Sequence, residues 1–264
     1  MTIYSRLAET LQYINPNFYK RRFFKKQVAL KQTNLLERNI EPELFWIQSF
    51  LSSDDVFMDV GANVGAYLYA LEGIVPAPQT YAFEPSKKLS RRLRRIFPGC
   101  HVFPIALSDK NEQAALTTPK INGEKIRSRS TLRNDLTEKN QDGSSEESVK
   151  VIRLDDWAYL EHLHRLSFIK IDVEGNERNV IQGAKKTIAR FRPTLMIEIE
   201  QRHHQIPVWQ VVEEICLLGY KPFYLNRTTL TLSPLTEKFL GEQNEGEVKN
   251  YAQYINNIIF TPEK

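Results

Sequence analysis

The chain has 264 residues, 41% of them hydrophobic and 26% charged, and its formal net charge is +4. These values are ordinary for a soluble globular protein, and the length suits one α/β domain with additions. No apolar run is long enough to cross a bilayer and no secretory pattern opens the chain, so we expect neither a membrane-spanning nor a secreted protein.

Residues 1–50 are expected to form a helical extension packed on a core domain over 51–264. Apolar residues recur at spacings of three and four over 3–14 and 35–51, which predicts two helices. Between them, the segment from Lys20 to Lys26 reads KRRFFKK. We favour a solvated helix face with two docking aromatics, because no RNA-binding motif accompanies the segment. Nucleic-acid binding is therefore not expected, whereas peripheral contact with an anionic membrane surface stays open.

The stretch 56–65, VFMDVGANVG, organises the predicted fold. A short apolar strand carries Asp59 near its end, and Gly61 and Gly65 then bracket a tight turn around Asn63. A helix follows. Strand, turn and helix together present backbone N–H groups and a positive helix end to a ligand. The spacing differs from the G-x-G-x-x-G loop of nicotinamide-binding folds, and an ordinary strand-to-helix connection is the alternative.

A second short strand, 80–83, ends on Glu84 and Pro85. An acid about 20 residues beyond a glycine loop is where nucleotide-binding α/β folds place the carboxylate that binds ribose. Glu84 therefore predicts a ribose ligand, with a surface acid before a turn as the alternative.

The next elements are a basic amphipathic helix after Pro85 and a third strand over 101–107. Alternating apolar and polar residues over 113–118 and 148–154 then predict a hairpin pair. The polar segment 119–147 between them shows no sustained period and is expected to be a long inserted loop. We interpret this loop, together with the N-terminal helices, as a lid that selects the acceptor substrate; a disordered insertion is the alternative.

The segment 167–177, SFIKIDVEGNE, is an apolar strand that breaks into an acid-rich turn. A helix, a fifth strand over 194–200, another helix and two final strands follow. Strands that alternate with helices predict a doubly wound, mostly parallel sheet. Ligands bind beyond the carboxyl ends of such strands, and the acids singled out all fall there, namely Asp59, Glu84, Asp172, Glu174 and Glu198.

The two cysteines, Cys100 and Cys216, have neither metal nor redox spacing. We expect buried free thiols and therefore a reducing, cytoplasmic setting.

Five blocks in this order resemble the FkbM family of methyltransferases: 59–65 (DVGANVG), 82–85 (AFEP), 106–109 (ALSD), 169–175 (IKIDVEG) and the pair 192–193 (RP) with 197–199 (IEI). The resemblance spans about residues 56–200. It implies a Rossmann-like class I methyltransferase sheet of seven strands, the last antiparallel, with S-adenosylmethionine as cofactor. It also implies methylation of a hydroxyl on a small-molecule or glycan acceptor. The cofactor residues it implies are Asp59, Gly61, Asn63, Gly65, Glu84, Ala106 and Leu107.

A sugar hydroxyl is a poor nucleophile at neutral pH, so methyl transfer to it calls for a positioned base. Asp172 is the expected general base, because it leaves the strand expected to lie next to the Asp59 strand, where the strand order reverses. Lys170 alternates to the same side of its strand and is expected to orient Asp172 by ion pairing. Glu174 is a further candidate catalytic residue. His203 is a rival candidate for the base, because histidine titrates near neutrality. The alternative is that His203 and His204 are exposed and have no catalytic role. A Lys–Asp pair that only shapes the following turn is the structural alternative.

Three questions stay open from the sequence. Asp172, Glu174, Glu198 and a histidine together suit a divalent metal, but no ligand spacing supports one, so no metal is expected. A nicotinamide-dependent oxidoreductase and a non-catalytic nucleotide-binding module are the alternative functions. The acceptor and the oligomeric state are not predicted.

Overall fold

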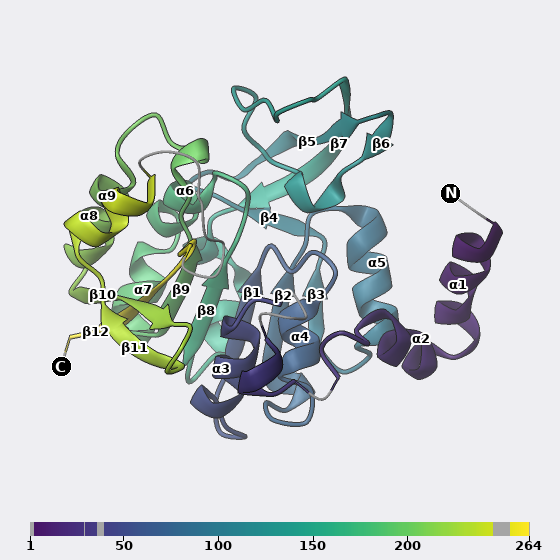
Figure 1. The fold of residues 1–264 in the computed structure, drawn as a ribbon, viewed down its shortest axis with the longest axis horizontal. Helices are drawn as coiled ribbons and strands as arrows, with labels where there is room; N and C mark the ends of the chain where they lie inside the picture. Colours follow the sequence, from purple (N-terminus) through teal and green to yellow (C-terminus); the bar gives the residue numbers. More distant parts are fainter. Residues whose placement is uncertain (1–2, 29, 36–39, 245–253, 264) are drawn as a thin grey trace.

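The fold is built on one twisted eight-stranded sheet with helices on both faces (Figure 1). The structure is a computed structural model that describes residues 3–28, 30–35, 40–244 and 254–263. In sheet order, the strands are β11 (Thr231–Pro234), β10 (Tyr220–Asn226), β12 (Asn257–Pro262), β9 (Thr194–Glu198), β8 (Phe168–Ile171), β1 (Phe57–Val60), β2 (Thr80–Phe83) and β3 (His101–Phe103).

Strand β1 lies near the middle of the sheet and pairs in parallel with β2 and β8. Its alternate side chains enter two cores, since Met58 and Val60 pack on one face and Phe57 on the other. The first core is covered by the later helices α6 (Glu177–Gln182), α7 (Lys185–Phe191) and α8 (Val208–Cys216), and a further helix, α9, spans Glu237–Asn244. The second core is covered by α3 (Glu43–Phe50), α4 (Ala66–Ala70) and α5 (Lys87–Ile96).

The predicted doubly wound sheet is confirmed, and β12 runs antiparallel to both β9 and β10 as expected for the last strand. The count of seven is one short, because β11 adds a strand on the outer edge of β10. The predicted third strand, 101–107, is also wrong as a single strand. Pro104 lacks an amide donor and separates β3 from β4 (Ile105–Leu107), which joins a second sheet.

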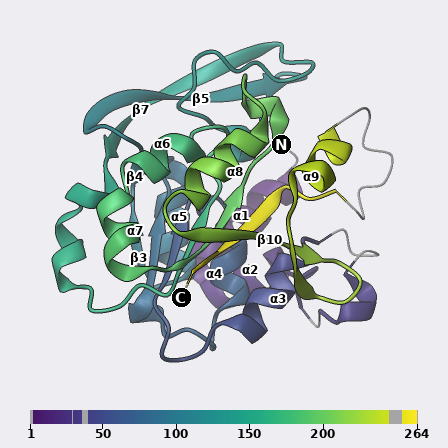
Figure 2. The same ribbon diagram turned by 90° about the vertical axis from the view of Figure 1, so that its left-hand side faces the viewer.

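The second sheet has the order β4-β7-β5-β6 and projects above the main sheet (Figures 1 and 2). Its long hairpin consists of β5 (Glu112–Ile121) and β7 (Gly143–Ile152), with the short β6 (Glu124–Lys125) beside β5. The predicted hairpin pair is confirmed, but the inserted loop is shorter than 119–147. Both strands continue through polar residues, which the period of the apolar residues alone does not reveal.

The N-terminal helices α1 (Ile3–Ile14) and α2 (Pro16–Phe23) pack against each other and against α5. The predicted helix over 35–51 is wrong in extent, since α3 begins only after Pro42, and 36–39 lie outside the described residues. Cys100 and Cys216 are free thiols, half-buried rather than buried. Within the described residues, no helix has both the length and the apolar character required to cross a membrane.

Candidate active site

The glycine loop between β1 and α4 adopts left-handed backbone angles at Gly61 (φ 85°), Asn63 (φ 48°) and Gly65 (φ 87°). The Gly61 N–H and the Ala62 N–H both donate to the Phe83 carbonyl, at 2.9 and 3.1 Å, which ties the loop to the end of β2. A Cβ on Gly61 would lie 1.8 Å from the Asp172 carbonyl oxygen. Glycine is therefore required here, because β1 and the exit of β8 touch through their backbones.

Gly65, at the other end of the loop, allows a close approach between helices. A Cβ at this position would lie 2.7 Å from the side chains of Leu93 and Phe97, at the end of α5. Gly65 therefore permits close packing between α4 and α5, and it is not among the residues that line the cleft described below.

Glu84 lies at the exit of β2 and is 6% exposed. Its two carboxylate oxygens accept hydrogen bonds from the Asn63 N–H and the Ser86 N–H, both at 2.8 Å. Burial raises the pKa of Glu84 to about 7, although these two hydrogen bonds oppose the shift. Glu84 thus holds the glycine loop in shape, and each of its oxygens keeps one lone pair for a further donor.

A cleft with an empty volume of about 590 Å³ opens between these strand ends and the hairpin. Of the predicted cofactor residues, the following line it: Gly61, Asn63, Glu84, Ala106 and Leu107. A glycine loop, a buried acid and an apolar wall in one cleft fit the nucleoside and charged groups of S-adenosylmethionine.

Asp59 is 1% exposed and does not line that cleft. Burial raises its pKa to about 6, against the pull of Lys170, and its Oδ1 atom has no hydrogen-bond partner among the described residues. Asp59 faces Lys170 in the register of β1 and β8. Asp59 therefore belongs with the acidic residues that surround Lys170 and not with the residues that line the cleft.

Lys170 and Asp172 form the predicted ion pair, with 2.9 Å between Nζ and Oδ2. The Lys170 side chain is 5% exposed and lies 4.8 Å from the centre of the Tyr67 ring, whereas the Asp172 side chain is 31% exposed and lines the cleft. Burial opposes the charge on Lys170, but Asp172, Asp59 and Glu41 outweigh it and raise the Lys170 pKa. A cation at this position keeps the neighbouring carboxylate ionised.

Asp172, Glu174 and Glu198 form a triad in which one oxygen of each lies within 4.8 Å of the others. Burial and then the charge of Asp172 raise the pKa of Glu198. Burial also opposes ionisation of Asp172, but Lys170 and a hydrogen bond with Glu198 hold its pKa below the usual value. In this arrangement Glu198 holds the proton and Asp172 the charge; a divalent cation is the other species that would neutralise such a triad.

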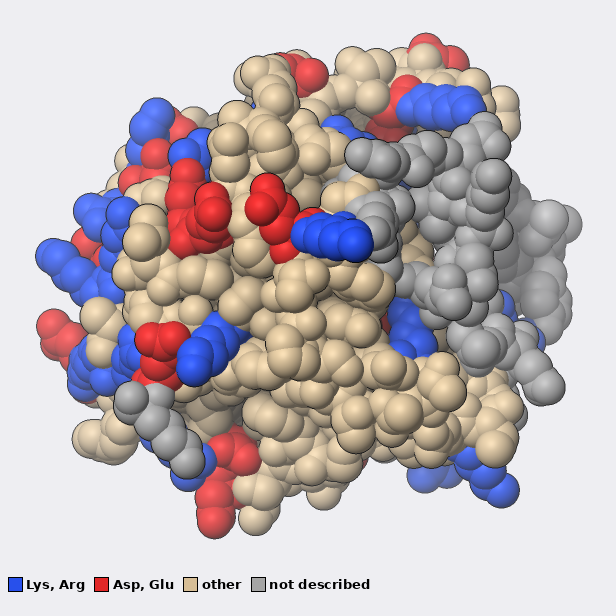
Figure 3. Space-filling view, turned by 60° about the vertical axis from the view of Figure 1, so that its left-hand side comes forward, with Lys and Arg blue, Asp and Glu red and all other residues tan. Residues whose placement is uncertain are grey.

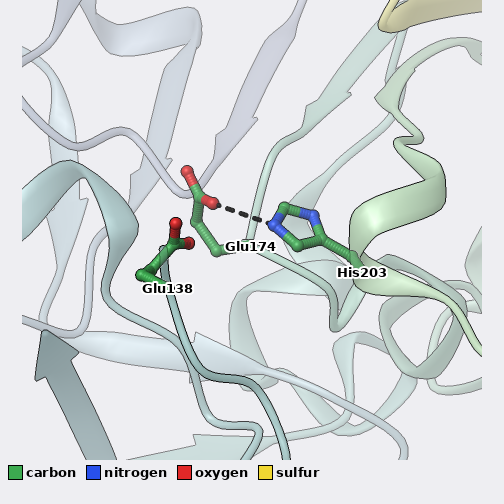
Figure 4. Close-up of side chains that lie close together, drawn as sticks. All are labelled: Glu138, Glu174 and His203. Atoms are coloured by element: carbon green, nitrogen blue, oxygen red, sulfur yellow. Dashed lines mark ion pairs between the residues drawn. The ribbon is translucent and has the colours of Figure 1, made fainter. Parts of the chain in front are cut away.

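Glu174 has a strained left-handed backbone (φ 53°), and the Thr131 hydroxyl donates to its carbonyl oxygen at 2.7 Å. Figure 4 shows its carboxylate directed at His203, with 3.4 Å between Oε2 and Nε2, and Glu138 beside it. Burial and then the charge of Asp172 raise the pKa of Glu174 to about 8. Burial and then Arg202 lower that of His203 to about 4, so His203 is neutral at pH 7.

His203 is therefore not the exposed, idle histidine that its position after a strand favours, since it is 4% exposed. It shares a small hollow with the hairpin. Besides His203 and Glu174, the residues that line this hollow are mostly polar: Thr117, Pro119, Arg129, Thr131, Leu136, Glu138 and Gln141. Glu174 lines both this hollow and the larger cleft, so the two spaces meet at its carboxylate.

Several residues of the site come from the hairpin and from the turn after β8. The hairpin contributes these lining residues to the larger cleft: Leu116, Arg127, Ser128, Ser130 and Leu132. All but Leu116 belong to the inserted segment 119–147, which is predicted to select the acceptor. The sequence does not indicate that they line this cleft, because the hairpin approaches it only in three dimensions. The role of Glu177 in shaping the turn could have been predicted from the sequence. Its Oε1 accepts hydrogen bonds from the Val173 and Gly175 N–H groups at 3.0 and 3.1 Å, and an acid two to four residues after such a turn suggests this local pattern.

Comparisons with known proteins identify the family of the chain. Residues 59–222 match the family model described as "Methyltransferase FkbM domain". The 2-O-methyltransferase NoeI of Sinorhizobium fredii is 27% identical over 173 residues, which cover 61% of this chain and 70% of NoeI.

Among solved structures, a methyltransferase FkbM from Methylobacillus flagellatus has a TM-score of 0.46 and 16% identity, covering 83% of this chain. This chain spans 50% of that one. A TehB-like methyltransferase from Corynebacterium glutamicum has a TM-score of 0.46 and 10% identity, over 95% of this chain and 99% of that one. The family match sets aside a nicotinamide-dependent oxidoreductase. The chain belongs to the FkbM family of S-adenosylmethionine-dependent methyltransferases.

Proposed function

We propose that this methyltransferase modifies a hydroxyl oxygen of a sugar-containing small molecule or glycan, with Asp172 as the general base. The observation that carries the proposal is the Asp172 carboxylate itself, which opens to the cleft while Lys170 holds it at 2.9 Å. Bound S-adenosylmethionine supplies a methyl group on a sulfonium, ready for in-line displacement by an acceptor oxygen.

The chain's own residues then have two tasks. The glycine loop, Glu84 and the apolar wall around Leu107 bind and orient the donor. Asp172 accepts the hydroxyl proton as the new bond to oxygen forms, and a positioned base of this kind contributes on the order of 100- to 10,000-fold. Lys170 and Glu198 act as positioning residues, since both bond to Asp172 and keep it ionised.

Two observations support an oxygen of a hydroxyl-rich acceptor. The relative NoeI carries the name 2-O-methyltransferase. The hollow next to Glu174 also offers hydroxyl, amide and guanidinium groups from Thr117, Gln141 and Arg129, which suit an acceptor with several hydroxyls. The hairpin supplies all three, consistent with a role for the inserted segment in choosing the acceptor.

Glu174 with His203 is the second candidate base. With a pKa of about 8, Glu174 is the stronger base but is largely protonated at neutral pH. The two candidates differ in the pH dependence of turnover. With Asp172 as the base, turnover has no rising limb near pH 8, whereas with Glu174 it rises through that region.

The test is an acceptor screen with isotope-labelled S-adenosylmethionine and matched panels of oligosaccharides, phenols and amines, read out by mass spectrometry. We expect label on a saccharide oxygen. Label on an amine or a carbon atom would contradict O-methylation. Label on phenols alone would contradict the proposal that the acceptor contains a sugar. The positive reaction is then repeated with EDTA to decide what neutralises the carboxylate triad. If a proton does so, turnover persists in EDTA. If a divalent cation does so, turnover is lost and returns on addition of Mg²⁺.

A further inference from the structure

Positive charge is concentrated in two segments of the chain, 10–36 and 85–108. Together they contain 12 of the 36 Lys and Arg residues and none of the 32 Asp and Glu residues. They therefore carry a formal charge of +12, and the remaining chain carries −8. The first segment contains α2 and the second contains α5, and the two helices pack against each other. We call their combined outer surface the basic face.

Cation–π contacts and hydrogen bonds attach the N-terminal helices firmly to α5. The Arg92 guanidinium lies 4.0 Å from the centre of the Phe23 ring, and that of Arg95 lies 3.8 Å from the Tyr13 ring. Arg95 also donates to the Gln12 side chain at 2.8 Å. In Figure 1 these helices lie side by side at one flank of the molecule. The basic face is thus part of the enzyme body and not a loose tail.

Large apolar side chains are exposed in the same place. Of the eight that are exposed among the described residues, five fall within residues 13–28: Tyr13, Ile14, Phe18, Phe23 and Val28. Ile14 is 76% exposed and Phe18 is 53% exposed. The exposed basic residues beside them include Arg21, Lys25, Lys88 and Arg91. On the side that carries α8 and α9, by contrast, Figure 3 shows acidic and basic side chains interspersed.

We propose that the basic face docks on an anionic membrane surface. Cationic side chains are attracted to anionic lipid head groups, and exposed aromatic and aliphatic side chains gain by entering the boundary between head groups and acyl chains. A nucleic acid would also be attracted by these positive charges. However, it has no apolar phase into which Ile14 and Val28 could insert, since only aromatic side chains stack on bases. The combination of aliphatic and aromatic exposure with one sign of charge therefore favours lipid.

The test is flotation of the full chain with two kinds of vesicle, one of phosphatidylcholine alone and one that also contains phosphatidylglycerol. We expect binding only to the anionic vesicles, weakened by added salt. Each Lys or Arg near an anionic surface contributes a factor of about five to binding. The double variant Arg21→Gln/Lys25→Gln should therefore reduce vesicle binding roughly 25-fold, and Phe18→Ser should reduce it independently of salt.

The matched control is Lys185→Gln/Lys186→Gln, which removes two exposed lysines from α7 on the opposite face of the sheet. This control should bind vesicles like the parent. An unchanged affinity for S-adenosylhomocysteine shows that each variant is folded, and it keeps this test separate from that of the acceptor. The proposal is overturned if the control and the Arg21/Lys25 variant bind alike, if neither vesicle binds the parent, or if an oligonucleotide binds while the vesicles do not.

Discussion

The two sides of the cleft are built in different ways. The cofactor side comes from neighbouring parts of the chain: the glycine loop, Glu84 and the β4 strand follow one another within residues 57–107. The side proposed to face the acceptor joins the exit of β8 to the hairpin and to His203, which are distant in sequence. A single stretch of sequence can thus form one wall of a binding site. Carboxylates with shifted pKa values, by contrast, are brought together from several distant segments. Substitutions should therefore separate donor binding from turnover, except where the two sides touch.

Gly61 is the position at which the two sides touch, so Gly61→Ala should have the largest effect. The new Cβ would meet the Asp172 carbonyl at 1.8 Å in addition to occupying a left-handed backbone. We expect a loss of more than about 4 kcal/mol in the free energy of unfolding, measured by urea denaturation. Gly73→Ala is the matched control, because Gly73 has the same φ of 85° and no atom within 4 Å of the added Cβ. It should cost only about 1–2 kcal/mol; equal losses would refute the close approach.

The second effect is a pH dependence of stability, to which buried acids on both sides of the cleft contribute. Burial raises the pKa of Glu84 and Glu177 to about 7 and that of Glu174 to about 8. The folded state therefore holds more protons than the unfolded state between about pH 5 and pH 8. The free energy of unfolding should fall as pH rises through this window, by up to about 1.4 kcal/mol per pH unit for each such group. Thermal melts that show rising stability from pH 5 to 8 would contradict the burial of these acids.

Glu84→Ala should affect donor binding alone. It removes the carboxyl group proposed to bind the donor and also frees the Asn63 and Ser86 N–H groups. We expect S-adenosylhomocysteine affinity to fall by roughly 1.5–3 kcal/mol in titration calorimetry, with turnover at saturating donor largely retained. NAD should give no heat with either protein. Loss of turnover with affinity intact would move Glu84 to the acceptor side.

Thr131→Val should produce the smallest effect, and on the acceptor side. The substitution keeps the shape of the side chain but removes the 2.7 Å hydrogen bond to the Glu174 carbonyl, which supports a strained backbone. We expect turnover to fall about tenfold, equivalent to about 1.4 kcal/mol, with donor affinity unchanged. A matched change at Thr229→Val, in the turn before β11, should leave both quantities alone. Weaker donor binding in Thr131→Val would mean that the hairpin holds the donor instead.

The sequence places the residues on the glycine-loop side of the cleft better than those on the hairpin side, and the reason is physical. A glycine loop, an acid about 20 residues later and acids at strand exits are local patterns with local causes, so Gly61, Asn63 and Glu84 could be placed in advance. The ion pair of Lys170 with Asp172 also follows from alternation along one strand. The packing role of Gly65 and the burial of His203 depend on distant partners, α5 and the hairpin, and no spacing reveals them.

The proposed reaction depends most on Asp172, and single-turnover kinetics of Asp172→Asn test that role most directly. The substitution preserves shape but removes the basic oxygen, so the rate at saturating donor and acceptor should fall by about 100- to 10,000-fold. Affinity for S-adenosylhomocysteine and the melting temperature should remain close to those of the control Asp54→Asn, which changes an exposed acid before β1. A variant that keeps its rate per folded molecule, or loses rate only in proportion to donor binding, would contradict the role of Asp172 as the base and assign the proton to Glu174 and His203.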